Sequence, residues 1–300
     1  MTAQLLYLDD EQAPALRLAD ACGLPALCVE RHRFPDEELR LRLPVDASGH
    51  LPDTLVIYRS LDRPNDKLVE LLLIAREARK LGARHLLLVT PYLAYMRQDI
   101  AFHPGEIVSQ RIIGAFLADL FDGVITVDPH LHRIDTLQEA IDSPYAISLS
   151  GAPALAELIA REVPGAILMG PDAESAQWIA SAAAVGGFEH GVCTKVRHGD
   201  HDVRITLPDV PVQGRAVVLL DDVASSGRTL AVATQLLLAA GAATVDVAVT
   251  HALFAHDALQ VIRDAGVRHI WSTDCIVHES NAIEMAPMLA RSVNTWLVQA

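Results

Sequence analysis

Short apolar runs alternate with longer amphipathic segments along most of the chain. The short runs have the length of buried strands, and the longer segments repeat apolar residues with the period of a helix. Strands and helices that alternate in this way are typical of parallel sheets covered by helices. The expected strands are residues 4–8, 55–58, 86–90, 124–128, 166–169, 216–220, 245–250 and 269–272. The expected helices are residues 65–81, 106–120, 152–163, 174–184, 228–240 and 257–265.

Two local signals refine this pattern. Gly82, Gly241 and Gly266 each follow an expected helix, where glycine commonly adopts the left-handed backbone that ends a helix. Residues 39–43 alternate strictly between Leu and Arg. A period of two predicts a half-exposed strand, here in a hairpin or a flap.

The length of 300 residues fits about two domains. Residues 142–153 are rich in turn-forming residues, so we place the domain boundary there. The chain carries 24 Lys and Arg against 38 Asp and Glu, a net charge of −14. This balance excludes a general nucleic-acid binder, which needs a basic stripe to neutralise phosphates. A local cationic pocket for a small phosphate ligand remains compatible with it.

The remaining composition indicates a folded, cytoplasmic protein. Hydrophobic residues make up 51% and charged residues 21%, which excludes a disordered chain. No apolar run approaches the ~20 residues that span a bilayer, so no membrane association is expected. Residues 1–10 carry no basic segment, so no signal peptide is expected. The four cysteines form no C-x-x-C pair and are interpreted as reduced thiols.

The sharpest chemical signal follows the apolar run 216–220. Asp221 and Asp222 come next, then a short Ser/Gly loop and the start of an expected helix. Loop amides and a helix N-terminus suit a phosphate, and paired carboxylates suit sugar hydroxyls or a hydrated Mg²⁺. The structural alternative is an ordinary strand followed by an Asp or Ser helix cap. The pattern resembles the ribose-5-phosphate loop of the phosphoribosyltransferase fold.

Further segments resemble those of the ribose-phosphate pyrophosphokinases, also called phosphoribosyl pyrophosphate synthetases. Among them are Pro91-Tyr92 followed by Tyr95-x-Arg97-Gln98-Asp99, and Lys195-Val196-Arg197. Eight such segments follow the family's order over most of the chain, whereas one alone would be weak evidence. They lie at residues 34–38, 61–72, 91–99, 126–130, 170–172, 195–197, 250–251 and 273–274.

The resemblance implies an α/β protein of two phosphoribosyltransferase-like domains, each a mainly parallel sheet flanked by helices. The domains would be residues 1–146 and 147–300, with the last residues packing back on the first domain. The implied activity transfers the β,γ-diphosphoryl group of MgATP to the C1 hydroxyl of ribose 5-phosphate, giving AMP and phosphoribosyl pyrophosphate. The implied cofactor is Mg²⁺. The implied assembly is a homo-oligomer, a dimer or a hexamer, because in this family the adenine hairpin reaches into a neighbouring subunit's site.

The resemblance also assigns residues to roles. The catalytic cations would be Lys195 and Arg197, on a polar hairpin able to close over substrate; an ordinary solvated hairpin tip is the alternative. The metal ligands would be His130 and Asp172. The ATP site would hold Phe34, Asp36, Glu37, Glu38, Arg97, Gln98 and Asp99. The ribose-5-phosphate site would hold Arg197, Asp221, Asp222, Ser225, Ser226, Gly227, Arg228 and Thr229.

Three positions depart from the family's pattern. Glu37 replaces the usual glycine of the adenine hairpin, Arg228 replaces a common second glycine of the phosphate loop, and Ala252 stands where Gly is common. Two rival functions remain open at this point: a catalytically silent regulatory homologue, and a phosphoribosyltransferase that consumes phosphoribosyl pyrophosphate. The fold alone does not decide between them.

Overall fold

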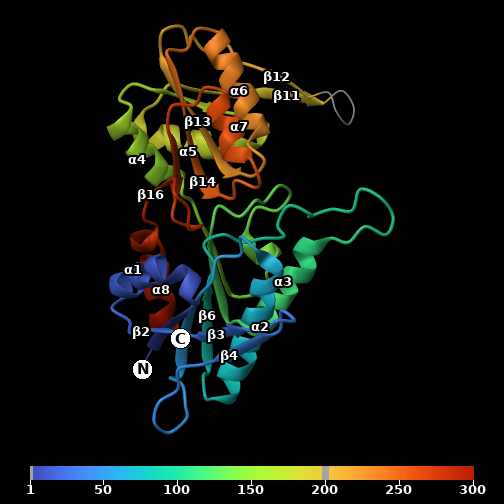
Figure 1. The fold of residues 1–300 in the computed structure, drawn as a ribbon, viewed down its shortest axis with the longest axis vertical. Helices are drawn as coiled ribbons and strands as arrows, with labels where there is room; N and C mark the ends of the chain where they lie inside the picture. Colours follow the sequence, from blue (N-terminus) through green and yellow to red (C-terminus); the bar gives the residue numbers. More distant parts are fainter. Residues whose placement is uncertain (1–2, 198–202) are drawn as a thin grey trace. The chain divides into compact units, whose positions relative to one another are not determined.

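The computed structural model describes residues 3–197 and 203–300, with the backbone alone at 195–197 and 203–204 (Figure 1). The chain divides into two compact units. Unit 1 comprises Met1–Leu149 and Met285–Ala300, and unit 2 comprises Ser150–Glu284. The sequence analysis places the division at 146/147, close to this point, and the final segment belongs to unit 1.

Unit 1 is built on a six-stranded, all-parallel sheet of order β2-β1-β5-β6-β7-β8. Helices α2 and α3 cover one face and α1 and α8 the other (Figure 1). Along β6, Leu86 and Leu88 pack into the cluster under α2 and α3, because alternate side chains of a strand point to opposite faces. The strands are β1 (Ala3–Tyr7), β2 (Ala26–Cys28), β5 (Thr54–Tyr58), β6 (His85–Val89), β7 (Gly123–Val127) and β8 (Tyr145–Leu149). The helices are α1 (Gln12–Cys22), α2 (Pro64–Lys80), α3 (Ser109–Leu120) and α8 (Ala286–Gln299), with the short turns η1 (Asp9–Glu11) and η2 (Leu137–Glu139).

Unit 2 repeats this plan, with a parallel sheet of order β10-β9-β13-β14-β15-β16. On β13, Val217 and Leu219 face α6 and α7, while Val218 and Leu220 face α4 and α5. The strands are β9 (Ile167–Gly170), β10 (His190–Val192), β13 (Ala216–Ala224), β14 (Thr244–Ala252), β15 (Ile270–Thr273) and β16 (Asn281–Ile283). The helices are α4 (Ala152–Glu162), α5 (Ala176–Gly186), α6 (Arg228–Ala239) and α7 (Ala258–Asp264), with the short turn η3 (Ala173–Ser175).

A separate antiparallel hairpin follows the second strand of each sheet. In unit 1 it joins β3 (Glu30–Arg33) to β4 (Leu39–Arg42), and in unit 2 it joins β11 (Thr194–Arg197) to β12 (Val203–Thr206). Each chain segment then returns to the other side of the first strand, so the strand order reverses between β1 and β5, and between β9 and β13. Such switch points are where open α/β sheets bind ligands, beyond the carboxyl ends of the strands.

The predicted fold class is confirmed: two parallel sheets, each flanked by helices. All eight expected strands and all six expected helices are present with shifted ends, and β4 shows the expected half-exposed alternation. The backbone is left-handed at Gly82, Gly241 and Gly266, as predicted. In the part of the chain that the structure describes, no helix is long and apolar enough to span a bilayer.

Candidate active site

Three carboxylates gather at the switch point of unit 2. Asp172 follows β9, and Asp221 and Asp222 lie in the neighbouring strand β13. The expectation that the strand ends at residue 220 is wrong, because β13 continues to Ala224 alongside β14. The two aspartates therefore sit on a rigid strand instead of a loop. Asp222 is buried, and its backbone N–H donates to Oδ1 of Asp221 at 3.1 Å.

The three carboxylates of this cluster repel one another. Burial raises the pKa of Asp221 well above the usual carboxyl range, and the charges of Asp222 and Asp172 raise it further. Asp172 also accepts a hydrogen bond from the Glu174 N–H at 3.2 Å, as the cap of η3. Carboxylates that repel each other in this way are relieved by hydroxyl donors or by a hard cation, and oxygen is the donor that Mg²⁺ prefers. The cluster therefore fits both a sugar and a magnesium ion.

The segment after β13 forms a tight loop into α6. Gly227 has φ 70°, and a Cβ at this position would lie 2.9 Å from the Ala258 carbonyl oxygen. Glycine is therefore required for both its conformation and its size. Helix α6 begins at Arg228, whose side chain is exposed and has no hydrogen bond or ion pair within the described residues.

The segment after β14 binds the loop through two backbone hydrogen bonds. The N–H groups of Phe254 and Ala255 donate to the carbonyl oxygens of Ala224 and Ser225, at 2.8 and 2.9 Å. These bonds occupy carbonyl groups of the loop, while the first N–H groups of α6 have no partner inside the helix. The predicted Ser225–Thr229 segment is thus a helix N-terminus suited to an anion. Phe254 and His256 hold left-handed backbone beside it, at φ 34° and 56°, and the sequence reasoning did not single them out.

The predicted catalytic hairpin is present as β11 and β12. Lys195 pairs with Ile205 and Arg197 with Val203 in the backbone register. The side chains of Lys195 and Arg197, and the hairpin tip at 198–202, lie outside the described residues. The roles assigned to these two cations stay predictions.

In unit 1, Phe34 to Glu38 form the turn of the β3–β4 hairpin. The Glu37 N–H donates to the Phe34 carbonyl, and the Phe34 N–H donates to the Glu38 carbonyl, both at 2.9 Å. This pattern is a type I turn closed by a left-handed residue, a position that favours glycine. Glu37 occupies it with φ 71°, so the turn is formed despite the missing glycine. The Phe34 ring is 38% exposed and meets His32 edge-on, at 4.8 Å between centroids.

The other nucleotide candidates lie in the irregular segment after β6. Arg97 is exposed, and the Gln98 side chain donates to the Ile100 carbonyl at 3.0 Å. The Asp99 carboxylate is buried and bound to Arg133 at 2.5 Å, so it orients that guanidinium. Within the described residues no hydrogen bond or ion pair joins this segment to the Phe34–Glu38 turn.

The two predicted metal ligands belong to different units. His130 follows β7 in unit 1, and its ring meets that of His132 edge-on, with centroids 4.2 Å apart. Asp172 follows β9 in unit 2. Each is therefore placed at the carboxyl end of a strand, and their joint role stays a prediction.

Unit 1 contains a charged network at its own switch point that the sequence reasoning missed. Arg59, after β5, binds Glu70 at 2.6 Å and Asp10 at 2.7 Å, and Lys67 binds Glu11 at 3.0 Å. The run Asp9-Asp10-Glu11 directly after the first strand was the available signal. Because Arg59 and Lys67 already neutralise these acids, the switch point of unit 1 differs in charge from that of unit 2.

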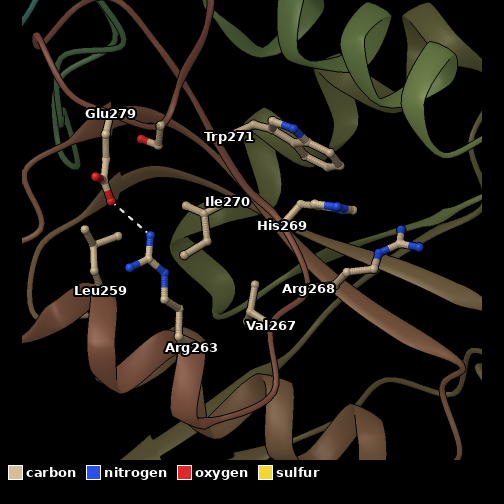
Figure 2. A pocket seen from close by; sticks show the side chains of 9 residues that line it. Leu259, Arg263, Val267, Arg268, His269, Ile270, Trp271 and Glu279 are labelled. Carbon is tan, nitrogen blue, oxygen red and sulfur yellow. Dashed lines mark hydrogen bonds and ion pairs between the residues drawn. The ribbon is translucent and has the colours of Figure 1, made fainter.

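A shallow pocket of about 340 Å³ lies near the start of β15, away from all predicted residues (Figure 2). Its cations are already paired: Arg263 binds Glu279 at 2.9 Å, and Arg268 binds Asp246 at 2.6 Å. The pocket lies toward the opposite end of the sheet from the carboxylate cluster, since β15 begins at Ile270. We therefore place the candidate site at the carboxyl ends of the strands.

The comparisons with known proteins match both units. Residues 3–120 match the N-terminal domain of ribose phosphate pyrophosphokinase, and residues 167–277 match the phosphoribosyl transferase domain. The ribose-phosphate pyrophosphokinase of Methanopyrus kandleri is 34% identical over 92% of this chain and 94% of its own. The chain belongs to the ribose-phosphate pyrophosphokinase family.

Other members of the ribose-phosphate pyrophosphokinase family match over similar lengths. That of Methanosarcina acetivorans is 32% identical over 94% of this chain and 96% of its own. The crystal structure of phosphoribosylpyrophosphate synthetase from Mycobacterium smegmatis superposes with a TM-score of 0.84 at 21% identity, covering 100% of both chains. The chain therefore has the phosphoribosylpyrophosphate synthetase fold over its whole length.

Proposed function

We propose that this protein is a ribose-phosphate diphosphokinase, which makes phosphoribosyl pyrophosphate and AMP from ribose 5-phosphate and MgATP. The observation that carries the proposal is the join of Asp221 and Asp222 on β13 to the Gly227 turn and the N-terminus of α6. Carboxylates for sugar hydroxyls and a helix N-terminus for the 5-phosphate then follow one another within the eight residues from Asp221 to Arg228. Membership of the family over nearly the whole chain supports the same reading.

The phosphate loop and the acid pair would fix the sugar. Ser225, Ser226, Gly227, Arg228 and Thr229 would hold the 5-phosphate, and Asp221 and Asp222 would accept hydrogen bonds from ribose hydroxyls. Arg197 would contribute a guanidinium from the β11–β12 hairpin. The C1 hydroxyl would then be held in line with the β-phosphorus of ATP, and such positioning is a large part of catalysis in phosphoryl transfer.

The nucleotide would be bound by unit 1. Phe34 would stack on the adenine, and Asp36, Glu37 and Glu38 would offer hydrogen-bond acceptors. Arg97 would face the phosphates, together with the Arg133 that the buried Asp99 orients. Gln98 would offer one hydrogen-bond donor and one acceptor. We further propose that the turn serves a neighbouring subunit, so that the enzyme works as a homo-oligomer, a dimer or a hexamer.

In the transfer step, the C1 hydroxyl oxygen forms a bond to the β-phosphorus while the bond from this phosphorus to the α,β-bridging oxygen breaks. AMP leaves with that electron pair, and the hydroxyl proton is released. Lys195 and Arg197 would neutralise the charge that builds on the transferred group. His130, Asp172 and the Asp221–Asp222 pair are the residues that would hold Mg²⁺, which when bound supplies positive charge to the phosphate oxygens.

The nucleotide product tests this function against its rivals. The protein is incubated with MgATP and ribose 5-phosphate, and the nucleotides are separated by chromatography. AMP in equal amount to an acid-labile sugar product, and only with both substrates and a divalent cation, supports the proposal. ADP as product means a phosphoryl-transferring kinase. Binding without turnover means a silent regulatory homologue, and pyrophosphate released from phosphoribosyl pyrophosphate and a base means a phosphoribosyltransferase.

Dilution tests the shared nucleotide site. Specific activity is measured across the concentration range in which sedimentation shows the oligomer to dissociate. We expect activity to fall with the oligomer. A fully active monomer would contradict the shared site and leave Phe34 to Glu38 serving their own subunit.

A further inference from the structure

The β3–β4 hairpin is not part of the six-stranded sheet of unit 1. It forms a two-stranded sheet of its own, and such a pair is only marginally stable without further support. Val29, just before β3, and Leu43, just after β4, flank the base of the hairpin and are buried in the core of unit 1. Beyond this base, the position of the two strands and of their turn depends on side-chain contacts.

One face of the hairpin carries those contacts. Arg31 pairs with Leu41 across the two strands, and Arg33 with Leu39, so these four side chains share a face. Leu41 packs against the core beneath α2. The opposite face carries Arg42, which pairs with Glu30 at 3.3 Å, and both of these side chains are largely exposed. The hairpin therefore has an attached face and a solvent face.

Arg31 joins the attached face to the charged network at the switch point. Its guanidinium binds Glu70 Oε1 on α2 at 2.8 Å and Asp9 at 2.6 Å, and lies 3.3 Å from Asp10. Only 19% of the Arg31 side chain is exposed, and Glu70 is fully buried. The pair is therefore shielded from solvent and salt, unlike the pair that Arg33 makes with Asp66 one helical turn away.

The Glu70 carboxylate is divided between two arginines. Its Oε2 accepts from Nε of Arg59 at 2.8 Å, and its Oε1 accepts from Arg31. Arg59 is itself 1% exposed and continues to Asp10 and Glu11. Loss of Arg31 would leave Oε1 buried beside the hairpin without its cation, and a buried carboxylate oxygen in that state is unfavourable.

We propose that Arg31 is a positioning residue for nucleotide binding, which fixes the Phe34–Glu38 turn through Glu70 to the body of unit 1. This inference rests on the proposed function. Phe34 lies three residues from Arg31 along an extended strand, roughly 10 Å. The anchor therefore sets where the turn points, whichever subunit's site the turn serves, and Arg31 itself does not touch the nucleotide.

The test compares Arg31→Met with Arg42→Met in the full chain. Both remove an arginine from the same hairpin, but Arg42 lies on the solvent face. We expect Arg31→Met to raise KM for ATP by about tenfold or more, because this factor corresponds to the loss of one charge-assisted hydrogen bond. KM for ribose 5-phosphate and kcat should stay nearly unchanged. Arg42→Met should leave all three constants near the wild-type values. Arg31→Lys should fall between, because an ammonium cannot bind Glu70 and Asp9 in the same fork geometry.

Hydrogen exchange gives a readout that does not depend on activity. In Arg31→Met the amides of Phe34 and Glu37 should exchange faster than in the wild-type and in Arg42→Met, while those of β5 and β6 stay protected. Equal exchange in the two variants, or a KM for ATP within about twofold of the wild-type value, overturns the proposal. If the wild-type chain forms no AMP, the proposed function fails, whereas the exchange rates still decide whether Arg31 anchors the hairpin.

Discussion

A Cβ atom at Gly227 would lie 2.9 Å from the carbonyl oxygen of Ala258. The Gly227 turn and the start of α7 are therefore packed backbone to backbone. Gly187 offers a matched comparison in the same unit, since it has φ 64° against 70° at Gly227 but nothing within 4 Å of a Cβ.

The comparison predicts different effects of two alanine substitutions. Gly187→Ala should lower the free energy of unfolding by about 1 kcal/mol, the cost of a left-handed alanine. Gly227→Ala should lower the free energy of unfolding further, because the Ala258 carbonyl must move. It should also weaken the binding of ribose 5-phosphate. Denaturant unfolding and calorimetric titration measure the two effects. Equal losses of stability with unchanged sugar-phosphate affinity would show that the close packing is not needed.

Glu37→Gly should stabilise the hairpin turn. The left-handed backbone costs Glu about 1–2 kcal/mol relative to glycine, whereas the solvent-exposed ion pair with Arg33 contributes little. The free energy of unfolding should therefore rise by about 1 kcal/mol. Glu37→Ala is the control, since it loses the pair and keeps the strain, and it should be no more stable than the wild-type. A loss of stability in Glu37→Gly would mean that the ion pair outweighs the strain.

Asp221→Asn should make the protein more stable and less able to bind sugar phosphate. Burial and the nearby carboxylates raise the pKa of Asp221, so the folded chain holds this proton more tightly than the unfolded chain. The ionised form therefore lowers stability as pH rises above the usual carboxyl range. The unfolding temperature of Asp221→Asn should exceed that of the wild-type at pH 7, by a margin that shrinks as pH falls.

The exposed Asp209 supplies the control for that measurement. Asp209→Asn removes a charge of the same sign from unit 2 without entering the cluster, and should leave the unfolding temperature unchanged at every pH. If both variants shift it equally, the gain reflects net charge and not repulsion at the site.

Lys195→Ala should lower kcat by about 100-fold or more and leave KM for ribose 5-phosphate nearly unchanged, since the charge matters most in the transition state. Steady-state kinetics provide the test. Lys80→Ala, which removes an exposed lysine from α2, should keep wild-type kinetics. A raised KM with unchanged kcat would move Lys195 from catalysis to substrate binding.

The sequence predicted the elements whose own pattern determines them and missed those that depend on neighbours. The apolar runs of β5, β6 and β7 are fully buried, so their hydrophobicity is sufficient evidence. The edge strands β2, β10 and β16 are only three residues long, too short for a periodic signal. Helices α1 and α8 pack against each other in unit 1 although α1 starts about 270 residues before α8 in the chain. Pro14 lies in the first turn of α1, where proline is tolerated because the N–H groups there have no partner within the helix.

The site residues also divide into those that a local sequence pattern reveals and those that only the fold brings together. The Asp221–Thr229 segment is contiguous, so its residues could be recognised together, although the extension of β13 through Asp221 and Asp222 depends on pairing with β14. The Arg31–Glu70 contact joins positions 39 residues apart, and each residue alone reads as an ordinary surface charge. Only the fold reveals that Glu70 is buried.

The fate of the β-phosphorus of ATP tests the central claim most directly. ATP labelled with ³²P at the β position is incubated with ribose 5-phosphate and Mg²⁺, and the sugar and nucleotide fractions are separated. The account predicts that the label leaves the nucleotide and appears in the sugar product, in equal amount to the AMP formed. Label that remains in the nucleotide as ADP would contradict diphosphoryl transfer, and with it the function proposed for this protein.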